Sequence, residues 1–463
     1  MGHIKITKGL DIPIIGKPEG GIKTLIPGGE VSPLVTPSQI ALDLNSFEGV
    51  KFKLLVKAGD RVKLGQPLVE DKDFPGRVFV SPAGGVILEV RRGLKRRLLD
   101  ITIEVDPHED IVQHPPLMFA NMPREALIEA LKAGGLFAHI RQRPFNFLAD
   151  PNKMPRSIFV KALESAPFLP SAEMQVMGHE REFQAGLDVL AKLTTGNVHL
   201  VHHKNTRLRA FLEAKGVQKH TAEGPHPIAN PSVHIHMIDP IRSPEDVVWT
   251  VDAHAVVCIG SFVLHGRYFV DRIVSIGGPG ILEGATGYFK VREGYPISAL
   301  ISGRIKKGLV RLISGDILKG RKVEAEDFLG FNDYGFAAVP ENTSREFLYF
   351  LGIGANKYTF SKTYLSGHFN HLHKDYEFTT NQHGEHRPFI DATLYDEVMP
   401  LNISTMHLVK AVLAEDYDLA AELGLLEVDS EDFALPTFVC PSKIEMVDII
   451  KKGLQRYATD NLK

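Results

Sequence analysis

Short apolar runs typical of strands alternate with longer segments typical of helices between residues 121 and 290. A helix is expected over residues 172–196, capped by Ser171, and another is expected from Pro244. The expected strands cover residues 157–160, 198–201, 233–237 and 255–259. Alternation of this kind predicts a largely parallel sheet covered by helices, and it constrains the fold more than any other feature.

A different pattern covers residues 51–105, where short alternating stretches are separated by turn glycines such as Gly59 and Gly65. The pattern resembles the flattened barrel of lipoyl and biotinyl carrier domains, whose hairpins use glycines in this way. Carrier domains display a modified lysine at a hairpin tip. Lys72 stands near that position but lacks the methionines that flank a biotin site, so we expect a structural barrel.

The remaining segments predict a small β-rich unit and a helical end. Short strands punctuated by glycine are expected over residues 296–340, and helices over residues 402–414, 416–423 and 444–456. The longest apolar run, residues 253–264, is too short to span a bilayer, and we find no secretory signal. Any membrane association is therefore expected to come through partners.

Charge and cysteine content narrow the function classes. A net charge of −3 offers no general electrostatic case for nucleic-acid binding. Cys258 and Cys440 are the two cysteines, and they make no disulfide framework, as is usual in a reducing cytosol. The densest basic run, residues 91–97, has two interpretations: a solvated turn, or a surface for an acidic partner or lipid headgroups.

The loop over residues 134–151 concentrates side chains that carry chemistry. Gly134 and Gly135 end the helix expected before it, and its prolines prevent it from continuing as a helix or a central strand. The candidate contact residues in it are Phe137, His139, Arg141, Arg143, Phe145 and Phe147. Two interpretations fit these residues equally: a connection with some buried aromatics, or a loop that faces a ligand or a partner.

Twenty histidines raise the question of a metal site. Residues 202–203 and 234–236 each hold a pair that is expected on a strand, where the two side chains point to opposite or alternate faces. The densest group lies between His368 and His386 and also contains His371, His373 and His383. Because its spacing differs from that of known zinc hydrolase helices, no metal site is predicted. A stand-alone zinc enzyme built on the His368–His386 cluster remains an alternative.

An ordered set of motifs identifies a family. The motifs are residues 4–14, 59–68, 143–145, 224–227, 234–236, 401–405 and 438–443. In this order, and over almost the full length, they resemble the A subunit of the Na⁺-translocating NADH:quinone reductase of bacteria. That family is related to the C subunit of the Rnf complex and, more remotely, to the flavin-bearing subunit of complex I.

The resemblance implies a multidomain α+β fold. Its expected parts are an N-terminal segment (residues 1–34), a lipoyl/biotinyl-like barrel-sandwich domain (35–115), a Rossmann-like α/β domain (116–290), a β-grasp domain (291–375) and a C-terminal helical domain (376–463). It also implies a peripheral subunit, without a transmembrane segment, on the cytoplasmic face of the bacterial inner membrane. The complex oxidises NADH, reduces ubiquinone to ubiquinol and pumps Na⁺ out of the cytoplasm, together with further subunits that include membrane subunits.

The chain departs from its flavin-bearing relatives where they bind the cofactor. Their glycine-rich loop lets the backbone approach the flavin phosphate, whereas bulkier side chains stand here. A polar segment that serves flavin and nucleotide in the relatives is replaced here by residues 161–167, with apolar residues in place of two carboxylates. The positions of this vacated flavin site are Ala138, Ile140, Lys161, Leu163 and Ala166.

The C-terminal region departs from the relatives in the same way. They carry a ferredoxin-type motif of four cysteines that binds an iron–sulfur cluster. Here Cys440 stands at the last cysteine position, and Ser430, Phe433 and Pro436 stand at the other three. One thiolate does not hold a cluster, so these positions form a vestigial cluster site. The resemblance therefore implies no flavin or iron–sulfur cofactor in this chain, with flavins and iron centres in the partner subunits.

Two roles within the family stay open for the loop. In the first, its phenylalanines pack against a quinone ring or a partner, while His139, Arg141 or Arg143 forms a hydrogen bond to a quinone oxygen. In the second, the chain is a purely structural assembly subunit without quinone contact. No catalytic residue is predicted, and the isolated chain is expected to have no activity of its own.

Overall fold

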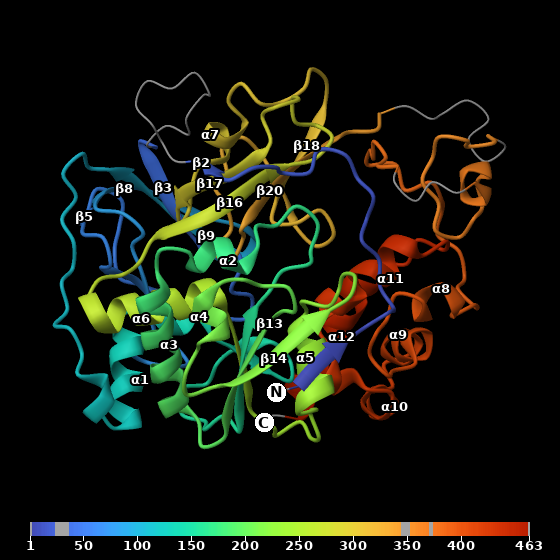
Figure 1. The fold of residues 1–463 in the computed structure, drawn as a ribbon. Helices are drawn as coiled ribbons and strands as arrows, with labels where there is room; N and C mark the ends of the chain where they lie inside the picture. The colour runs from blue at the N-terminus through green and yellow to red at the C-terminus, as the bar shows by residue number, and fades with distance from the viewer. Residues whose placement is uncertain (1, 24–36, 344–351, 370–373, 462–463) are drawn as a thin grey trace.

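The computed structural model describes residues 2–23, 37–343, 352–369 and 374–461 (Figure 1). Part of the N-terminal segment and the histidines His371 and His373 lie outside these residues. Three β assemblies and a helical C-terminal part make up the molecule. Within the described residues, no helix is long and apolar enough to cross a membrane.

A seven-stranded sheet forms the centre of the fold, in the order β1-β14-β13-β12-β15-β10-β11. Neighbouring strands from β1 to β15 run parallel, and β10 and β11 add an antiparallel edge. The prediction of a largely parallel sheet is therefore confirmed. The strands are β1 (Gly2–Lys5), β10 (Arg141–Arg143), β11 (Phe147–Leu148), β12 (Ser157–Ala162), β13 (Asn197–His203), β14 (Gln218–Glu223) and β15 (Val248–Asp252).

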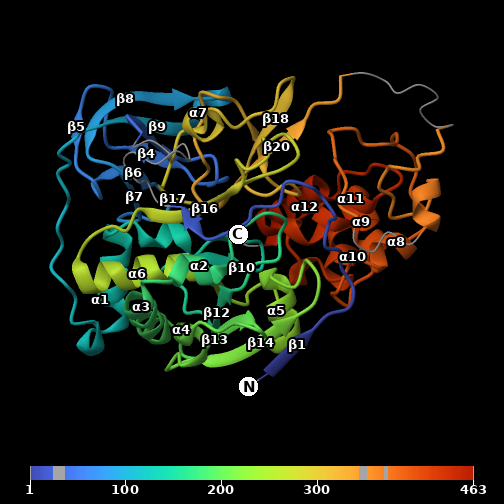
Figure 2. The same ribbon diagram turned by 45° about the horizontal axis from the view of Figure 1, so that its top comes forward.

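Helices cover both faces of this sheet, because its strands bury apolar residues on both sides. Ile158 and Val160 belong to one core, together with helices α1, α3 and α6, while Phe159 belongs to a second core with α5 and the C-terminal helices. The arrangement of these helices around the sheet can be followed in Figures 1 and 2. The helices are α1 (Arg124–Ala133), α2 (Ala172–Val176), α3 (Glu180–Leu193), α4 (Arg209–Leu212), α5 (Pro231–Ile238) and α6 (Ala253–His265).

Several sequence expectations for this region are wrong. The strand expected at residues 255–259 is the buried helix α6, and the helix expected from Pro244 is replaced by strand β15. The strand expected at residues 233–237 is helix α5, which begins with Pro231. The helix expected over residues 172–196 is divided into α2 and α3 at Gly178, where φ is 84°. A short run that is buried all round shows no period that separates helix from strand.

The N-terminal barrel consists of two small antiparallel sheets, as the glycine-punctuated pattern predicts. One sheet has the order β3-β9-β8-β5 and the other β4-β6-β7. Lys72 is exposed in the turn between β6 and β7. The strands are β3 (Gln39–Asp43), β4 (Phe52–Leu54), β5 (Arg61–Val62), β6 (Pro67–Asp71), β7 (Val78–Val80), β8 (Gly85–Arg92) and β9 (Leu98–Val105).

A six-stranded sheet and a set of helices complete the chain. The sheet has the order β19-β18-β20-β16-β17-β2 and carries helix α7 (Ile297–Ile301). Its strands are β2 (Ile22–Lys23), β16 (Asp271–Gly277), β17 (Gly287–Arg292), β18 (Val310–Ser314), β19 (Arg321–Val323) and β20 (Gly335–Pro340). The C-terminal helices are α8 (Thr393–Asp396), α9 (Thr405–Leu413), α10 (Tyr417–Glu422), α11 (Ala434–Val439) and α12 (Met446–Asn461).

Candidate functional site

The candidate site lies at the carboxyl edge of the parallel strands. Lys161 near the end of β12 is the register partner of Asp252 at the end of β15. On the other side of β15, strand β10 pairs Arg141 with Thr250 and Arg143 with Val248. Ligands of open parallel sheets bind at this edge, because the strands end there and the following loops diverge.

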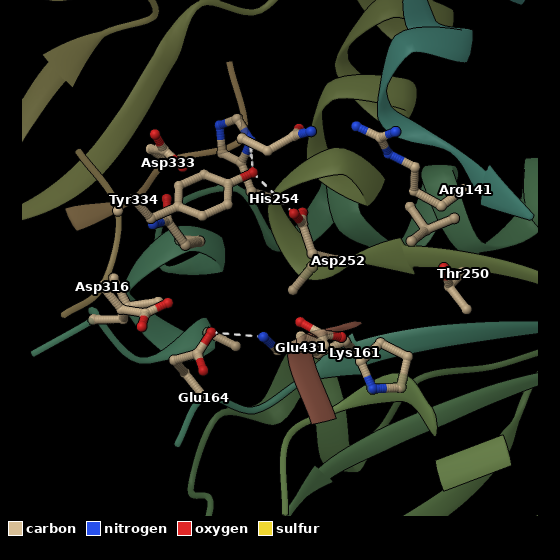
Figure 3. A pocket seen from close by; sticks show the side chains of 18 of the residues that line it. Arg141, Lys161, Glu164, Thr250, Asp252, His254, Asp316, Asp333, Tyr334 and Glu431 are labelled. Carbon is tan, nitrogen blue, oxygen red and sulfur yellow. Dashed lines mark hydrogen bonds and ion pairs between the residues drawn. The ribbon is translucent and has the colours of Figure 1, made fainter. Parts of the chain in front are cut away.

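A cavity of about 340 Å³ opens at this edge (Figure 3). Strands β10, β12 and β15 and the start of α6 form one wall. The opposite wall comes from segments far away in the chain: the connection between β18 and β19, residues 332–334 before β20, and Glu431 of the C-terminal part. The cavity therefore lies where the α/β region, the six-stranded sheet and the helical end meet.

Lysines and carboxylates in the cavity neutralise one another. The Lys161 ammonium lies 2.7 Å from a carboxylate oxygen of Glu164 (Figure 3). The Lys319 ammonium is paired with Glu431. Burial raises the pKa of Glu431, but Lys319 and Arg143 oppose it and lower the pKa to about 2. Burial likewise lowers the pKa of Lys319, yet Glu431 and Asp316 hold it above its ordinary value. Lys319 and Glu431 are therefore ionised and paired at neutral pH.

The pairing of the two lysines with carboxylates affects which ligands can bind in the cavity. A flavin or dinucleotide phosphate needs unpaired cations or the free backbone N–H groups of a glycine-rich turn. Here both lysines are neutralised, and the N–H groups of Ser165 and Ala166 are already donated to the Glu164 carboxylate, at 2.8 and 3.0 Å. The lysines and the N–H groups at the end of β12 are therefore occupied by carboxylates, whereas Arg141 in the same cavity has no ion pair among the described residues.

A second polar group lies deeper in the cavity. The Tyr334 hydroxyl donates to the Asp252 carboxylate at 2.9 Å and lies 3.2 Å from Nδ1 of His254 (Figure 3). Burial, reinforced by Arg272, lowers the pKa of His254 to about 4, so this imidazole is neutral at pH 7. Burial raises the pKa of the Tyr334 phenol, and the Asp252 charge adds to that shift. The group therefore offers neutral hydrogen-bonding atoms beside one carboxylate.

The loop residues that the sequence singled out are divided between two cavities and the core. His139, Arg141 and Arg143 line the first cavity. Phe145 and Phe147, with Arg141, line an adjoining cavity of about 440 Å³ that α12 closes on its far side. Phe137 lines neither of these two; its buried ring packs edge-on against Trp249, 5.9 Å away between centroids.

Arg141 and Arg143 have different surroundings. Arg143 is 3% exposed, donates to the Ser232 hydroxyl at 2.9 Å and lies 3.4 Å from the Asp429 carboxylate and 3.5 Å from Glu431. It therefore joins the loop to the C-terminal part. Arg141 donates to the Ser46 carbonyl at 3.1 Å and faces both cavities. Burial lowers its pKa to about 10, which leaves it protonated at neutral pH.

The predicted vacated flavin positions lie close to this edge. Lys161 and Leu163 line the first cavity, whereas the side chains of Ala138 and Ile140 are buried in the barrel and α/β cores. Ala166 is half-buried, and its N–H is donated to Glu164.

The four predicted vestigial cluster positions lie around helix α11. Phe433, Pro436 and Cys440 are buried, and the Cys440 sulfur lies 3.1 Å from the Tyr395 hydroxyl. Ser430 lines the second cavity. The one thiol among these positions is thus enclosed in apolar packing.

The histidines do not form a metal centre within the described part of the chain, where no group of three or more His, Cys, Asp or Glu side chains is placed to hold an ion. His202 and His203 lie on β13 as expected, whereas His234 and His236 lie on α5 rather than on a strand. His234 Nε2 bonds the Ile228 carbonyl at 2.8 Å.

Sequence reasoning missed several of the residues that line the first cavity, including Asp252, Lys319, Glu431, Asp333 and Tyr334. Asp252 had a local signal, since it follows an apolar run and its carboxylate accepts the N–H of Ala255 as the N-cap of α6. That signal was hidden because the strand before it was expected to be a helix. The others come from distant segments and carry no local signal.

Comparison with known proteins gives matches along most of the chain. A family model described as "NqrA N-terminal barrel-sandwich hybrid domain" matches residues 4–106, and one described as "NqrA second alpha/beta domain" matches residues 122–268. A third, described as "NQRA C-terminal domain", matches residues 273–325. The barrel predicted from the glycine pattern agrees with the first of these.

Full-length relatives carry one common name, that of the A subunit of the Na(+)-translocating NADH-quinone reductase. The protein of Chlamydia caviae is 37% identical over 467 residues, which cover 99% of this chain and 97% of that protein. Those of Chlamydia pneumoniae and Saccharophagus degradans are 38% and 34% identical, covering 99% and 98% of this chain and 98% and 99% of their own lengths. A solved NAD⁺-reducing [NiFe]-hydrogenase in the H2-reduced state is 11% identical to this chain, with a TM-score of 0.35. The match covers 76% of this chain and 67% of that chain, and this similarity is too low to support a conclusion about fold or function.

Proposed function

Because this chain belongs to the family formed by the A subunit of the Na(+)-translocating NADH-quinone reductase, we propose that it works as a peripheral subunit of such a complex. In this proposal the complex oxidises NADH, reduces ubiquinone to ubiquinol and pumps Na⁺ out of the cytoplasm. The chain lies on the cytoplasmic face of the bacterial inner membrane and contacts further subunits, including membrane subunits. Flavins and iron centres belong to those partners.

The proposed contribution of this chain is a contact to the quinone or to a partner at the loop. The observation that carries it is Arg141, a protonated guanidinium that lines both cavities, the second of which also holds Phe145 and Phe147. Phe145 and Phe147 stack on each other with centroids 5.8 Å apart and supply an apolar wall for a ring. Arg141 supplies a charged hydrogen-bond donor for a ring carbonyl. His139, which is buried beside Tyr268, and Arg143 hold the loop in place through their hydrogen bonds.

The absence of a flavin and of an iron–sulfur cluster in this chain belongs to the same proposal. The pairing of Lys161 with Glu164 supports the first, because it neutralises the cation at the end of β12. The presence of a single buried thiol, Cys440, among the four motif positions supports the second. We further propose that residues 1–34, 35–115, 116–290, 291–375 and 376–463 are the N-terminal segment, barrel, Rossmann-like, β-grasp and helical domains.

The test uses the assembled complex with Arg141→Gln and, separately, Phe147→Ala. Phe147 is 41% exposed, and Arg141 has no ion-pair partner in the part of the chain that the structure describes, so neither change leaves a buried charge unpaired. We expect KM for ubiquinone to rise about 10-fold, the loss of one good contact, with unchanged NADH oxidation by an artificial acceptor. Lys452→Gln, on the exposed surface of α12, is the control.

Two results would overturn the quinone contact. An unchanged KM in both variants of an intact complex would assign the loop to assembly alone. Loss of partner subunits from either variant, with normal KM in the complexes that remain, would assign it to a subunit interface. A stoichiometric metal on the purified chain would favour the zinc enzyme built on residues 368–386.

A further inference from the structure

The tip of the β8–β9 hairpin carries a concentrated and uncompensated positive charge. Arg92, Lys95, Arg96 and Arg97 are all exposed, and no ion pair reaches any of them within the described chain. The charge is local, because the chain as a whole has a net charge of −3. Leu94 stands among these four cations and is 88% exposed, the most exposed large apolar side chain of the described residues.

The tip is held in one conformation by its own backbone. The Gly93 N–H donates to the Arg97 carbonyl at 2.8 Å, and the Arg97 N–H donates to the Leu94 carbonyl at 3.2 Å. Lys95 and Arg96 adopt the left-handed region, with φ of 54° and 60°. Two non-glycine residues in that region cost folding energy, and such strain persists where the surroundings enforce it.

Contacts at the base of the hairpin hold it to the rest of the molecule. Arg91 is bound to the Asp100 carboxylate and lies 3.0 Å from Asp327, which leads into the six-stranded sheet region. Arg97 donates to the Asn45 carbonyl at 3.0 Å. Arg91 is thereby neutralised, while the four tip cations have no ion pair within the described chain. Because the tip is ordered before it binds anything, little conformational entropy is lost on contact.

We propose that this tip, residues 92–97, binds the anionic phospholipid headgroups of a membrane surface. Phosphate groups neutralise the four cations, and Leu94 enters the boundary between headgroups and acyl chains. A flat bilayer accepts a protruding tip of this kind at any point, whereas a folded acidic protein would need a hollow of matching shape for the leucine. Clustered cations with one apolar side chain supply the two weak signals that reversible membrane binding requires.

The binding would also orient the protein. The hairpin belongs to the barrel, and Arg97 connects it to Asn45, a residue that lines the second cavity. With the tip on the membrane, Asp327 and the adjoining sheet are the parts next to the surface, since Arg91 ties them to the hairpin.

The experiment is co-sedimentation of the full chain with vesicles of phosphatidylcholine, alone or mixed with phosphatidylglycerol. Wild-type protein is expected to bind the mixed vesicles, and to bind less as salt rises. The double variant Lys95→Glu/Arg96→Glu should bind more than about 30-fold more weakly, because each cation removed costs roughly fivefold and each new carboxylate is repelled by the anionic surface. Leu94→Ser should weaken binding several-fold while keeping the salt dependence.

The matched control is Arg181→Glu/Lys215→Glu, which makes the same charge change at two exposed cations of the α/β region. It should bind like wild type. Emission of Trp249, the single tryptophan, checks that each variant is folded. Equal binding to vesicles of phosphatidylcholine alone, equal losses in the control, or no binding of wild-type protein to mixed vesicles would each overturn the proposal. If wild-type protein bound no vesicles and the tip variant failed to bind a protein that wild-type protein binds, the tip would be assigned to an acidic protein partner instead.

Discussion

Replacing Arg143 by methionine tests whether this residue of the loop is structural. Its side chain is 3% exposed and meets Ser232, Asp429 and Glu431, which joins β10 to the C-terminal part. Removing one partner of a buried ion pair costs about 3–5 kcal/mol. Part of this cost is offset here, because Asp429 still accepts from Asn146 at 2.7 Å and Glu431 remains paired with Lys319. We therefore expect the free energy of unfolding to fall by about 2–3 kcal/mol.

The assay is urea unfolding followed by tryptophan fluorescence. Trp249 is the single tryptophan, is fully buried, and lies on β15 next to the residue that pairs with Arg143. Its emission should shift to the red at a lower urea concentration in Arg143→Met. Asp429→Asn and the double variant complete a cycle, in which we expect a coupling energy of about 1–2 kcal/mol.

One outcome would refute the reasoning. If Arg143→Met unfolded at the wild-type urea concentration and coupled to Asp429→Asn by less than about 0.5 kcal/mol, the contacts with the C-terminal part would carry no stability. A raised KM for ubiquinone with that unchanged stability would then make Arg143 a ligand contact instead. Arg141→Gln serves as comparison, since its hydrogen bond to the Ser46 carbonyl is the smaller loss.

Two further predictions follow from buried groups. Burial lowers the pKa values of His234 and His254 to about 4, so that on acidification the unfolded chain takes up their protons before the folded chain does. The free energy of unfolding should therefore fall as the pH drops from about 6.5 to 4, by about 2 kcal/mol for each histidine at pH 5. A melting temperature that does not change between pH 7.5 and 5 would contradict this. Gly260→Ala should destabilise by about 2 kcal/mol or more, because the added Cβ would lie 1.7 Å from the Glu182 carbonyl where α3 and α6 cross. Gly21→Ala, with open space around its Cβ, is the control in thermal unfolding.

The sequence predicts the architecture better than the individual elements. Turn glycines such as Gly59 and Gly65, with φ near 89° and 82°, reveal the barrel because only glycine adopts that conformation readily. Parallel strands are recognised by their buried, β-branched runs. Two of the errors fall on residues 233–237 and 255–259, which are mostly buried in helices, so that neither alternation nor helical periodicity shows in the order of side chains.

The candidate site was only partly predictable, for a physical reason. The sequence located the loop and the end of β12, and the structure brings Arg141 and Lys161 to one cavity. The opposite wall depends on tertiary packing, since Lys319 and Glu431 are separated by more than a hundred residues and act only as a pair. An ion pair between distant segments leaves no spacing that a sequence pattern can detect.

The short segment around Ser430 is relevant to both cofactor losses that the resemblance implies, the loss of the flavin and the loss of the iron–sulfur cluster. Ser430 stands at the first of the four positions where the relatives are expected to carry cluster cysteines. The residues on either side of it, Asp429 and Glu431, supply the carboxylates that meet Arg143 and Lys319 at the edge of the sheet. A cluster-binding segment would need thiolates at this place, and an anion-binding cavity would need those two cations unpaired. Acidic residues at 429 and 431 oppose the anion-binding requirement directly, while the serine between them removes a thiolate. The charge pairing on which we base the proposed absence of a flavin, and the loss of the cluster motif that the resemblance implies, thus meet in one turn of the chain, which joins the helical end to the loop.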